Sequence, residues 1–211
     1  MITSFRLLIV AVIAFLLGGC AVGVKHRYDN VEPEIQTSGK VNAFALGVQD
    51  RRPYVVSGKK TQDFVGLSRG GFGNPFDVST ESGKALSEDI SAVVAKALSR
   101  KGASVAVIRV SPLDSEKSVI AQLAKTGSRG VLVSIAEWKS DTYMSVSLHY
   151  DVTVSIVEPG GRIAATKRLQ GTDALGTAGV NPPELSREVI PPAFKRKMEE
   201  LFASPEVAPF L

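Results

Sequence analysis

The longest regular pattern in the chain is an alternation of apolar and polar side chains over residues 145–157. Its apolar positions are Val146, Leu148, Tyr150, Val152, Val154 and Ile156, and its polar positions are Ser147, His149, Asp151, Thr153 and Ser155. Because successive side chains point to opposite faces of a strand, the pattern predicts a long strand with one buried and one wet face. It also predicts that helices cover only one side of the sheet.

Shorter apolar runs bounded by turn residues predict further strands. These runs cover residues 44–49, 63–67, 104–110, 130–138 and 162–172. Pro159-Gly160-Gly161 separates the last run from the long strand, so these two strands are expected to pair antiparallel.

Helical spacing of apolar residues appears in three segments, residues 79–101, 115–126 and 181–202. Ser79 or Thr80 is suited to cap the first helix, and Pro191-Pro192 is expected to kink or split the last one. The resulting order is β(β)αβαβββα. It predicts an α+β fold, with a mixed, mostly antiparallel sheet and helices packed on one face.

The only cysteine, Cys20, ends the motif Leu17-Gly18-Gly19-Cys20 behind an uninterrupted apolar run over residues 7–17. A bilayer span needs about 20 apolar residues, so this run is typical of a signal peptide and too short for a mature anchor. The apolar–small–small–Cys ending is typical of a bacterial lipobox. We therefore predict cleavage between Gly19 and Cys20 and attachment of lipid to the Cys20 thiol. An ordinary secretory signal with an incidental cysteine is the alternative.

The motif divides the chain into three predicted parts. Residues 1–19 are the signal peptide, residues 20–41 the lipidated cysteine and a polar tether, and residues 42–211 a single periplasmic domain. Two or more acyl chains hold a protein stably in a bilayer, so the attachment is expected to last. Ala21 stands where lipoproteins retained in the inner membrane carry Asp. The expected location is therefore the outer membrane, with the domain facing the periplasm.

Composition argues against several classes of function. The net charge of +4 is small and dispersed, so no binding of nucleic acid is expected. Acylation of Cys20 leaves no thiol for a disulfide, so a hydrophobic core must hold the fold. The chain shows no nucleophile–base set, no metal-ligand spacing and no phosphate-binding loop. We therefore expect no catalytic residue, no metal and no cofactor, and thus no enzyme.

A glycine-rich segment, Arg69-Gly70-Gly71-Phe72-Gly73-Asn74-Pro75, precedes the first predicted helix. Its glycine spacing fits neither of the common nucleotide-binding motifs. Glycines favour a mobile loop, in which Phe72 either packs inward or is offered to a partner. We predict that partner contact involves Arg69, Gly70, Gly71, Phe72 and Gly73.

Two other groups of polar residues lie outside this loop. Asp50-Arg51-Arg52-Pro53 closes the first strand and is expected to be solvated, and His149 beside Asp151 is expected to lie on the wet face. His26 falls in the predicted tether. A pocket that brought Asp50, Arg51, His149 and Asp151 together would instead favour an enzyme or a carrier.

Several of these features together resemble the YajG-type bacterial lipoproteins. They are the lipobox, the strand ending at 50–53, the loop at 70–73, the helix closing with Arg100-Lys101-Gly102 and the strand at 145–157. The element order is also similar to the small α+β module at the N-terminus of TolB. The resemblance implies an outer-membrane lipoprotein with a docking domain that is not an enzyme, and it carries over no binding residues.

Two functions from different classes follow. The leading hypothesis is a lipid-anchored, non-catalytic docking module that binds an envelope protein, peptidoglycan-associated machinery or its own copies. Exposed sheet edges and the glycine-rich loop would be the contact surfaces. The alternative is an envelope enzyme or a carrier of small molecules such as lipids, which needs a concave pocket with convergent polar groups.

Overall fold

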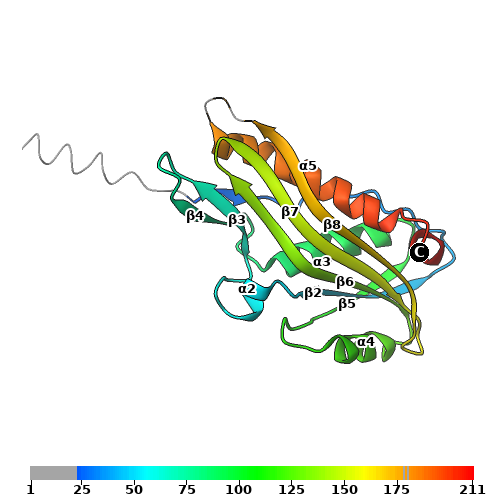
Figure 1. The fold of residues 1–211 in the computed structure, drawn as a ribbon. Helices are drawn as coiled ribbons and strands as arrows, with labels where there is room; N and C mark the ends of the chain where they lie inside the picture. Colours follow the sequence, from blue (N-terminus) through cyan, green and yellow to red (C-terminus); the bar gives the residue numbers. More distant parts are fainter. Residues whose placement is uncertain (1–22, 178, 180) are drawn as a thin grey trace, which may run out of the picture.

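The computed structural model describes residues 23–177, 179 and 181–211, which form an α+β fold around one mixed sheet (Figure 1). The sheet has eight strands in the order β1-β4-β3-β6-β2-β5, and β7 and β8 extend it from β6. The strands are β1 (Lys25–His26), β2 (Ala43–Asp50), β3 (Phe64–Arg69), β4 (Pro75–Thr80), β5 (Ser104–Ile108), β6 (Arg129–Thr142), β7 (Ser145–Val157) and β8 (Ile163–Thr177). The predicted α+β class is therefore confirmed.

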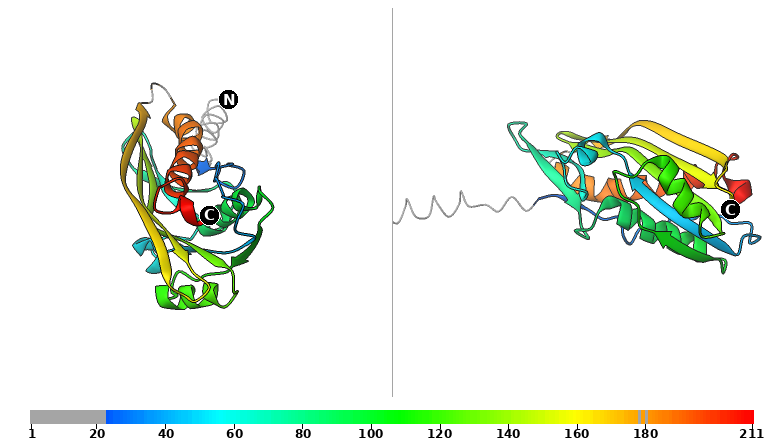
Figure 2. Two further views of the ribbon diagram at one scale, coloured as in Figure 1. Left: turned by 90° about the vertical axis from the view of Figure 1, so that its right-hand side faces the viewer. Right: turned by 90° about the horizontal axis from the view of Figure 1, so that it is seen from below.

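The sheet mixes parallel and antiparallel pairings, and β3 pairs antiparallel with β4 between two parallel pairings. The longest pairings are the antiparallel ones of β6 with β7 and of β7 with β8, which build a meander. Parallel pairings join β2 to β5, β2 to β6, β3 to β6 and β1 to β4. The sheet is curled, and its hollow side holds two long helices (Figure 2).

The helices are α2 (Pro53–Val56), α3 (Leu86–Ser99), α4 (Glu116–Ala124), α5 (Pro182–Phe202) and the short 3-10 helix η1 (Ala208–Phe210). Helices α3 and α5 pack on the same face of the sheet, where the main hydrophobic core lies. Helix α4 departs from the predicted one-sided arrangement. Its Val119 and Leu123 pack on Ala45 and Leu132, which point away from the main core and form a second, smaller cluster. Strand alternation thus gives β2 and β6 two apolar faces, and each face is covered.

The alternating strand is β7, and its inner face matches the prediction. Its apolar residues are buried, apart from Tyr150, which is partly buried against the core. The outer face is less wet than predicted. Asp151 is only 9% exposed because Arg168 of β8 donates two hydrogen bonds to it, from Nε at 2.7 Å and from Nη2 at 2.6 Å. Long polar side chains of the neighbouring strand therefore cover part of this face.

The first long helix begins later than the sequence predicts. Helix α3 starts at Leu86, whereas Ser79 and Thr80 belong to β4, which pairs with β1 and β3. Pairing with a strand on each side satisfies the backbone hydrogen-bonding groups of this segment. This outweighs the suitability of its serine and threonine as helix N-caps. The predicted inner face of the helix is correct, since Leu86, Ile90, Val93, Val94, Ala97 and Leu98 are all buried.

Helix α5 is continuous over Pro182–Phe202, so of the predicted kink or split at Pro191-Pro192 the split does not occur. A proline at position i removes the hydrogen bond to the carbonyl at i−4. For these two prolines the carbonyls belong to Arg187 and Glu188, which are exposed. Water can therefore satisfy both carbonyls, and the packed residues on the opposite face keep the helix together.

Residues 23–41 pack against the domain, which differs from the predicted tether. Tyr28 is 1% exposed and lies edge-on to Trp138 and Phe194, with ring centroids 6.4 and 5.2 Å away. The Trp138 indole donates a hydrogen bond of 3.1 Å to the Tyr28 hydroxyl. The segment is polar in sequence, but its buried residues alternate with exposed ones and fasten it to the core.

Candidate functional site

The glycine-rich segment forms the tip of the β3–β4 hairpin. The Gly70 amide donates to the Asn74 carbonyl at 2.9 Å, and the Gly73 amide donates to the Gly70 carbonyl at 2.7 Å. Gly73 has a φ of 82°, in the left-handed region that favours glycine. The turn places Phe72 outside the protein, where its side chain is 99% exposed. Of the two placements weighed for Phe72, the structure shows the outward one.

Arg69 anchors this hairpin to the next strand. Its guanidinium donates to both carboxylate oxygens of Asp141 on β6, from Nε at 2.9 Å and from Nη2 at 2.7 Å. Hydrogen bonding from Arg69 lowers the pKa of Asp141, so the carboxylate stays charged and paired. The Arg69 guanidinium is thus engaged within the protein and fixes the position of the tip.

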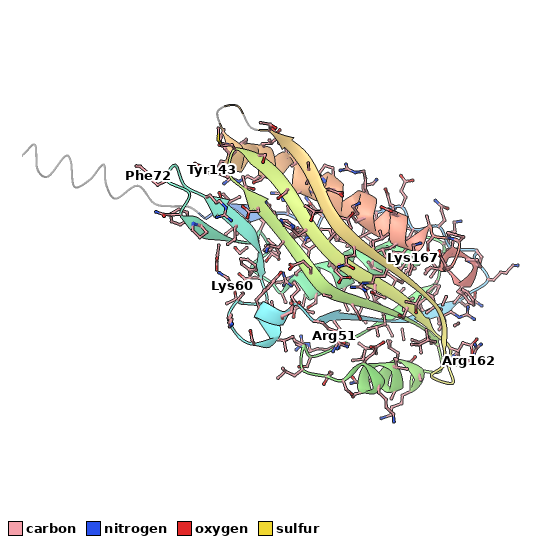
Figure 3. All side chains as sticks on the ribbon, in the orientation of Figure 1. Arg51, Lys60, Phe72, Tyr143, Arg162 and Lys167 are labelled. Atoms are coloured by element: carbon pink, nitrogen blue, oxygen red, sulfur yellow. The ribbon has the colours of Figure 1, made fainter. Side chains whose placement is uncertain are left out.

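The β6–β7 turn lies at the same end of the sheet as this hairpin tip. Strands β3 and β6 are parallel, with Ser68 opposite Thr142, so the residues that follow each strand emerge together. Tyr143 is 42% exposed and Met144 is 68% exposed in this turn. Figure 3 shows Phe72 and Tyr143 at one end of the molecule and Arg162 at the other. The sequence analysis missed Tyr143 and Met144, although two large apolar residues in a tight turn were a visible signal.

Four side chains therefore expose apolar surface at one end of the fold, and we call them the tip surface. They are Phe72, Phe76, Tyr143 and Met144, with Phe76 51% exposed. The carboxylates nearest to them in sequence are Asp77 and Asp141. Lys60 donates to both oxygens of Asp77, at 2.5 and 2.7 Å, and Arg69 holds Asp141. The tip surface is consequently apolar and glycine-rich, and the acidic groups behind it are paired.

The described chain begins beside this same hairpin. Strand β1 runs parallel to β4, with Lys25 opposite Ser79, and the Ser79 amide donates to the Val24 carbonyl at 3.4 Å. A side-chain carbon at Gly23 would lie 3.8 Å from the Asp77 carbonyl oxygen. Because the two strands are parallel, the upstream direction of β1 is the direction in which β4 leads back to the tip. Cys20 and Gly19, the predicted lipidation and cleavage positions, lie outside the described residues.

The polar residues that would favour an enzyme are not brought into one pocket. Asp50 and Arg52 form a fully buried ion pair, in which Arg52 Nε donates to Asp50 at 2.8 Å and Nη2 donates at 2.6 Å. The expectation that this group is solvated is wrong for these two residues. Arg51 alone points outward and lies 3.6 Å from Glu116. The turn after β2 directs neighbouring arginines to opposite sides.

His149 and Asp151 share a shallow depression on the outer face of the sheet. Its lining also includes residues of β6 and β8, but neither Asp50 nor Arg51. His149 Nδ1 lies 2.9 Å from the Thr172 hydroxyl oxygen, and the Asp151 carboxylate forms an ion pair with Arg168. Both side chains are thus held by neighbours on the adjacent strand β8.

A groove of 710 Å³ opens between the start of α3 and the strand β5 with its following loop. Its lining mixes apolar and charged side chains, among them Val107, Ile108, Glu88, Arg109 and Asp114. Strand β5 forms one edge of the sheet and pairs with β2 alone among the described strands. The volume falls within the range of small-molecule sites, roughly 300–1,000 Å³.

His26 is buried, although the sequence places it in the predicted tether. Its Nε2 lies 3.3 Å from the Ser186 hydroxyl of α5, and Nδ1 has no hydrogen-bond partner among the described residues. Burial, with a smaller effect of the Arg187 charge, lowers the pKa of His26 to about 3. The imidazole is therefore neutral at ordinary pH and serves as part of the packing between β1 and α5.

No group of three or more His, Cys, Asp or Glu side chains among the described residues is arranged to hold a metal ion. None of the helices over the same residues is both long and apolar enough to cross a membrane.

Three solved structures are similar to this chain over most of its length. Protein XCC0632 from Xanthomonas campestris, of the DUF330 family, has a TM-score of 0.48 and 11% identity, with 85% of this chain and 89% of that chain covered. An uncharacterized protein has a TM-score of 0.47 and 7% identity, with 85% and 97% covered. Lipoprotein GNA1162 from Neisseria meningitidis has a TM-score of 0.35 and 12% identity, with 74% and 97% covered.

None of these likenesses carries an argument about function, since all three TM-scores lie below 0.5. No family model matches the sequence. No curated protein matches it either. The resemblance to YajG-type lipoproteins and to the TolB module therefore stays a prediction from the sequence.

Proposed function

We propose that this chain is a lipoprotein anchored through Cys20 in the outer membrane, with a periplasmic domain that acts as a non-catalytic interaction module. The lipobox supports the anchor, and the contact residues predicted from the sequence, 69–73, support the module. The proposal combines three features: a lipid site, a domain that begins close behind it, and a contact surface on that domain.

The observation that carries the proposal is the exposure of Phe72. A phenylalanine with 99% of its surface in water gains nothing for folding, whereas burying it against a partner is favourable. The Arg69–Asp141 pair and the turn hydrogen bonds hold the backbone of the turn in place, so little backbone order must be gained on binding. Large aromatic side chains are frequent anchors of binding surfaces.

The anchor is tested by Cys20→Ser. The hydroxyl cannot take the thioether-linked lipid, so incorporation of a labelled fatty acid should fall to background while the wild-type chain is labelled. Mass spectrometry of the mature N-terminal peptide gives the same answer independently. Label at the wild-type level on the variant would contradict the lipobox assignment.

The contact surface is tested in crosslinked cells with Phe72→Ala. Recovery of the molecules that are crosslinked to the lipoprotein should fall. The melting temperature should stay unchanged because the Phe72 side chain packs on nothing. Leu113→Ala is the matched control, since Leu113 is 77% exposed but lies in the loop after β5. Equal recovery for both variants would remove Phe72 from the contact, and a lower melting temperature for Phe72→Ala would make it a structural residue.

The alternative function, a carrier of small molecules, draws its support from the groove between α3 and β5. Ala92 is exposed and lines this groove, so Ala92→Trp should fill part of it without disturbing the core. Under the carrier hypothesis, mass spectrometry finds a small molecule that copurifies with the wild-type protein and is lost from Ala92→Trp. An empty wild-type protein would leave the interaction module as the better account.

A further inference from the structure

We infer that the tip surface contacts the lipid bilayer that carries the acyl chains of Cys20, so that the domain stands on the membrane in a fixed orientation. The inference rests on the proposed lipid anchor and names the partner of the proposed contact surface. It rests on three observations: the reach of the chain from Cys20, the length of the hairpin, and the chemistry of the exposed side chains.

The first observation is the short distance between the lipid-bearing residue and the packed domain. Gly23 is already in contact with β4, and only two residues separate it from Cys20. Three residue steps span at most about 10 Å even when fully extended. The acyl chains therefore cannot enter the bilayer while the β3–β4 hairpin stays far from the surface.

The second observation is the direction and length of the hairpin. Strand β4 continues toward the tip from Asp77, the residue beside Gly23, for two more paired residues. At about 3.3 Å per residue these give roughly 7 Å, beyond which loop 70–74 and the Phe72 side chain still project. The tip therefore projects from Gly23 by about the distance that three residues can span, on the side toward which β1 leads upstream, because β1 and β4 are parallel.

The third observation is the composition of the tips. Phe72, Tyr143 and Met144 suit the boundary between head groups and acyl chains, where aromatic side chains accumulate. Residues 69–76 and 142–150 contain no Asp or Glu, and Arg69 keeps Asp141 paired behind the tips. Contact with the membrane thus brings no unpaired carboxylate toward the hydrocarbon.

The shape of this surface favours a bilayer over a protein partner or a second copy. The exposed residues sit on the β3–β4 hairpin and on the β6–β7 turn, and Figure 3 shows Phe72 and Tyr143 at one end of the molecule. Protein interfaces are typically closely packed patches with shape complementarity, whereas a fluid bilayer accepts separate protruding anchors. Gly23, where the described chain begins, lies beside the same hairpin.

This placement also orients the rest of the domain. Strand β7 has 13 residues and runs from the tip end to the turn before Arg162. At about 3.3 Å per residue the strand is roughly 43 Å long, so the far turn stands tens of ångströms from the membrane. The β7–β8 turn and the C-terminal residues near it are then presented to the periplasm.

The test uses the lipidated full-length protein in vesicles of phosphatidylethanolamine and phosphatidylglycerol, with and without bromine on the acyl chains. Phe72→Trp and Tyr143→Trp place a reporter in the tip surface, and Ile163→Trp places one at the far end, where Ile163 is 40% exposed. The native Trp138 is fully buried and gives the same background in every variant. Equal melting temperatures show that the substitutions leave the fold intact.

Bromine should reduce the emission of the new tryptophan at 72 and 143 about twofold or more, because an indole at the interface meets the upper acyl chain. Emission at position 163 should not change. Equal emission at all three sites in an acylated protein would overturn the membrane contact alone. A tryptophan at 72 that is shielded from iodide but unaffected by bromine would indicate a protein partner or a second copy. Protein whose Cys20 carries no acyl group would overturn the anchor and the membrane contact together.

Discussion

Replacing Arg52 by Met should be among the most damaging single changes in the domain. The Arg52 side chain is fully buried and donates to Asp50, to the Phe64 carbonyl at 2.5 Å and to the Trp138 carbonyl at 3.2 Å. Burial by itself lowers the pKa of Arg52, but its hydrogen bonds and charge interaction with Asp50 raise it overall. The guanidinium thus ties the end of β2 to β3 and β6 from inside the protein.

The magnitude follows from what the substitution leaves behind. Met has a similar volume, so the loss comes from an unpaired buried carboxylate at Asp50 and from carbonyls that lose a donor. Removing one partner of a buried ion pair costs about 3–5 kcal/mol. Since domains are stable by about 5–15 kcal/mol, this is a large fraction of the total. For a domain of this size the melting temperature should fall by roughly 6–20 °C.

The neighbouring Arg51 supplies a matched control. It is exposed, and among the described residues it pairs with Glu116 alone, at 3.6 Å, so Arg51→Met should cost about 0–1 kcal/mol. Urea denaturation measures the free energy of unfolding of both variants. An unchanged slope of this free energy against urea concentration shows that unfolding remains two-state. The double variant Asp50→Leu with Arg52→Met should recover part of the loss, because it leaves no lone charge inside. A loss below about 1 kcal/mol for Arg52→Met would refute the reasoning, since it would mean that water reaches the pair.

Two further predictions concern the core and the pH dependence of stability. Ile90→Ala should destabilise the domain by about 2–4 kcal/mol because Ile90 is fully buried. Ser147→Ala, on the outer face of β7, should cost under about 0.5 kcal/mol. Similar losses for the two variants in urea denaturation would contradict the assignment of the inner and outer faces. His26 has a pKa lowered from 6.5 to about 3 by burial and by Arg187, so the unfolded chain binds the extra proton first as the pH falls. Its contribution to stability is full above pH 6.5 and is lost at about 1.4 kcal/mol per pH unit down to pH 3. Between pH 6.5 and 4.5 the wild-type protein should therefore lose about 2–3 kcal/mol more than His26→Leu, and identical pH profiles would show that His26 is solvated.

The parts of the fold that follow from local pattern could be predicted from the sequence. The alternation over 145–157 gave β7 and its buried face, because strand geometry leaves no other arrangement that hides those side chains. Helical spacing gave the inner face of α3 and the core positions Val119 and Leu123 of α4 in the same way. The turn at Phe72 could also be predicted from the sequence, since closely spaced glycines rarely occur inside a strand.

The remaining differences arise where tertiary contacts override a local signal. Ser79 and Thr80 have the chemistry of helix caps, but pairing with β1 and β3 makes them a strand. Tyr28 and His26 lie in a polar stretch, and tertiary packing buries them, His26 against α5 and Tyr28 against β6 and α5. Arg52 follows a second arginine, and nothing in the sequence tells which of the two turns inward. Such contacts join residues far apart in the chain, so their spacing in sequence carries no trace of them.

Tertiary contacts also explain why only half of the tip surface was predicted from the sequence. The surface exists because strand pairings bring distant residues to one end of the sheet. Phe72 and Tyr143 are 71 positions apart, and the parallel register of β3 with β6 brings them to the same end of the sheet. The parallel register of β1 with β4 then places Gly23 beside the same hairpin, with the upstream end of β1 toward the tip. An antiparallel β1 would begin at the end of β4 that is remote from the tip. Under the proposed lipid anchor, the direction of a two-residue strand therefore decides which end of the domain faces the bilayer.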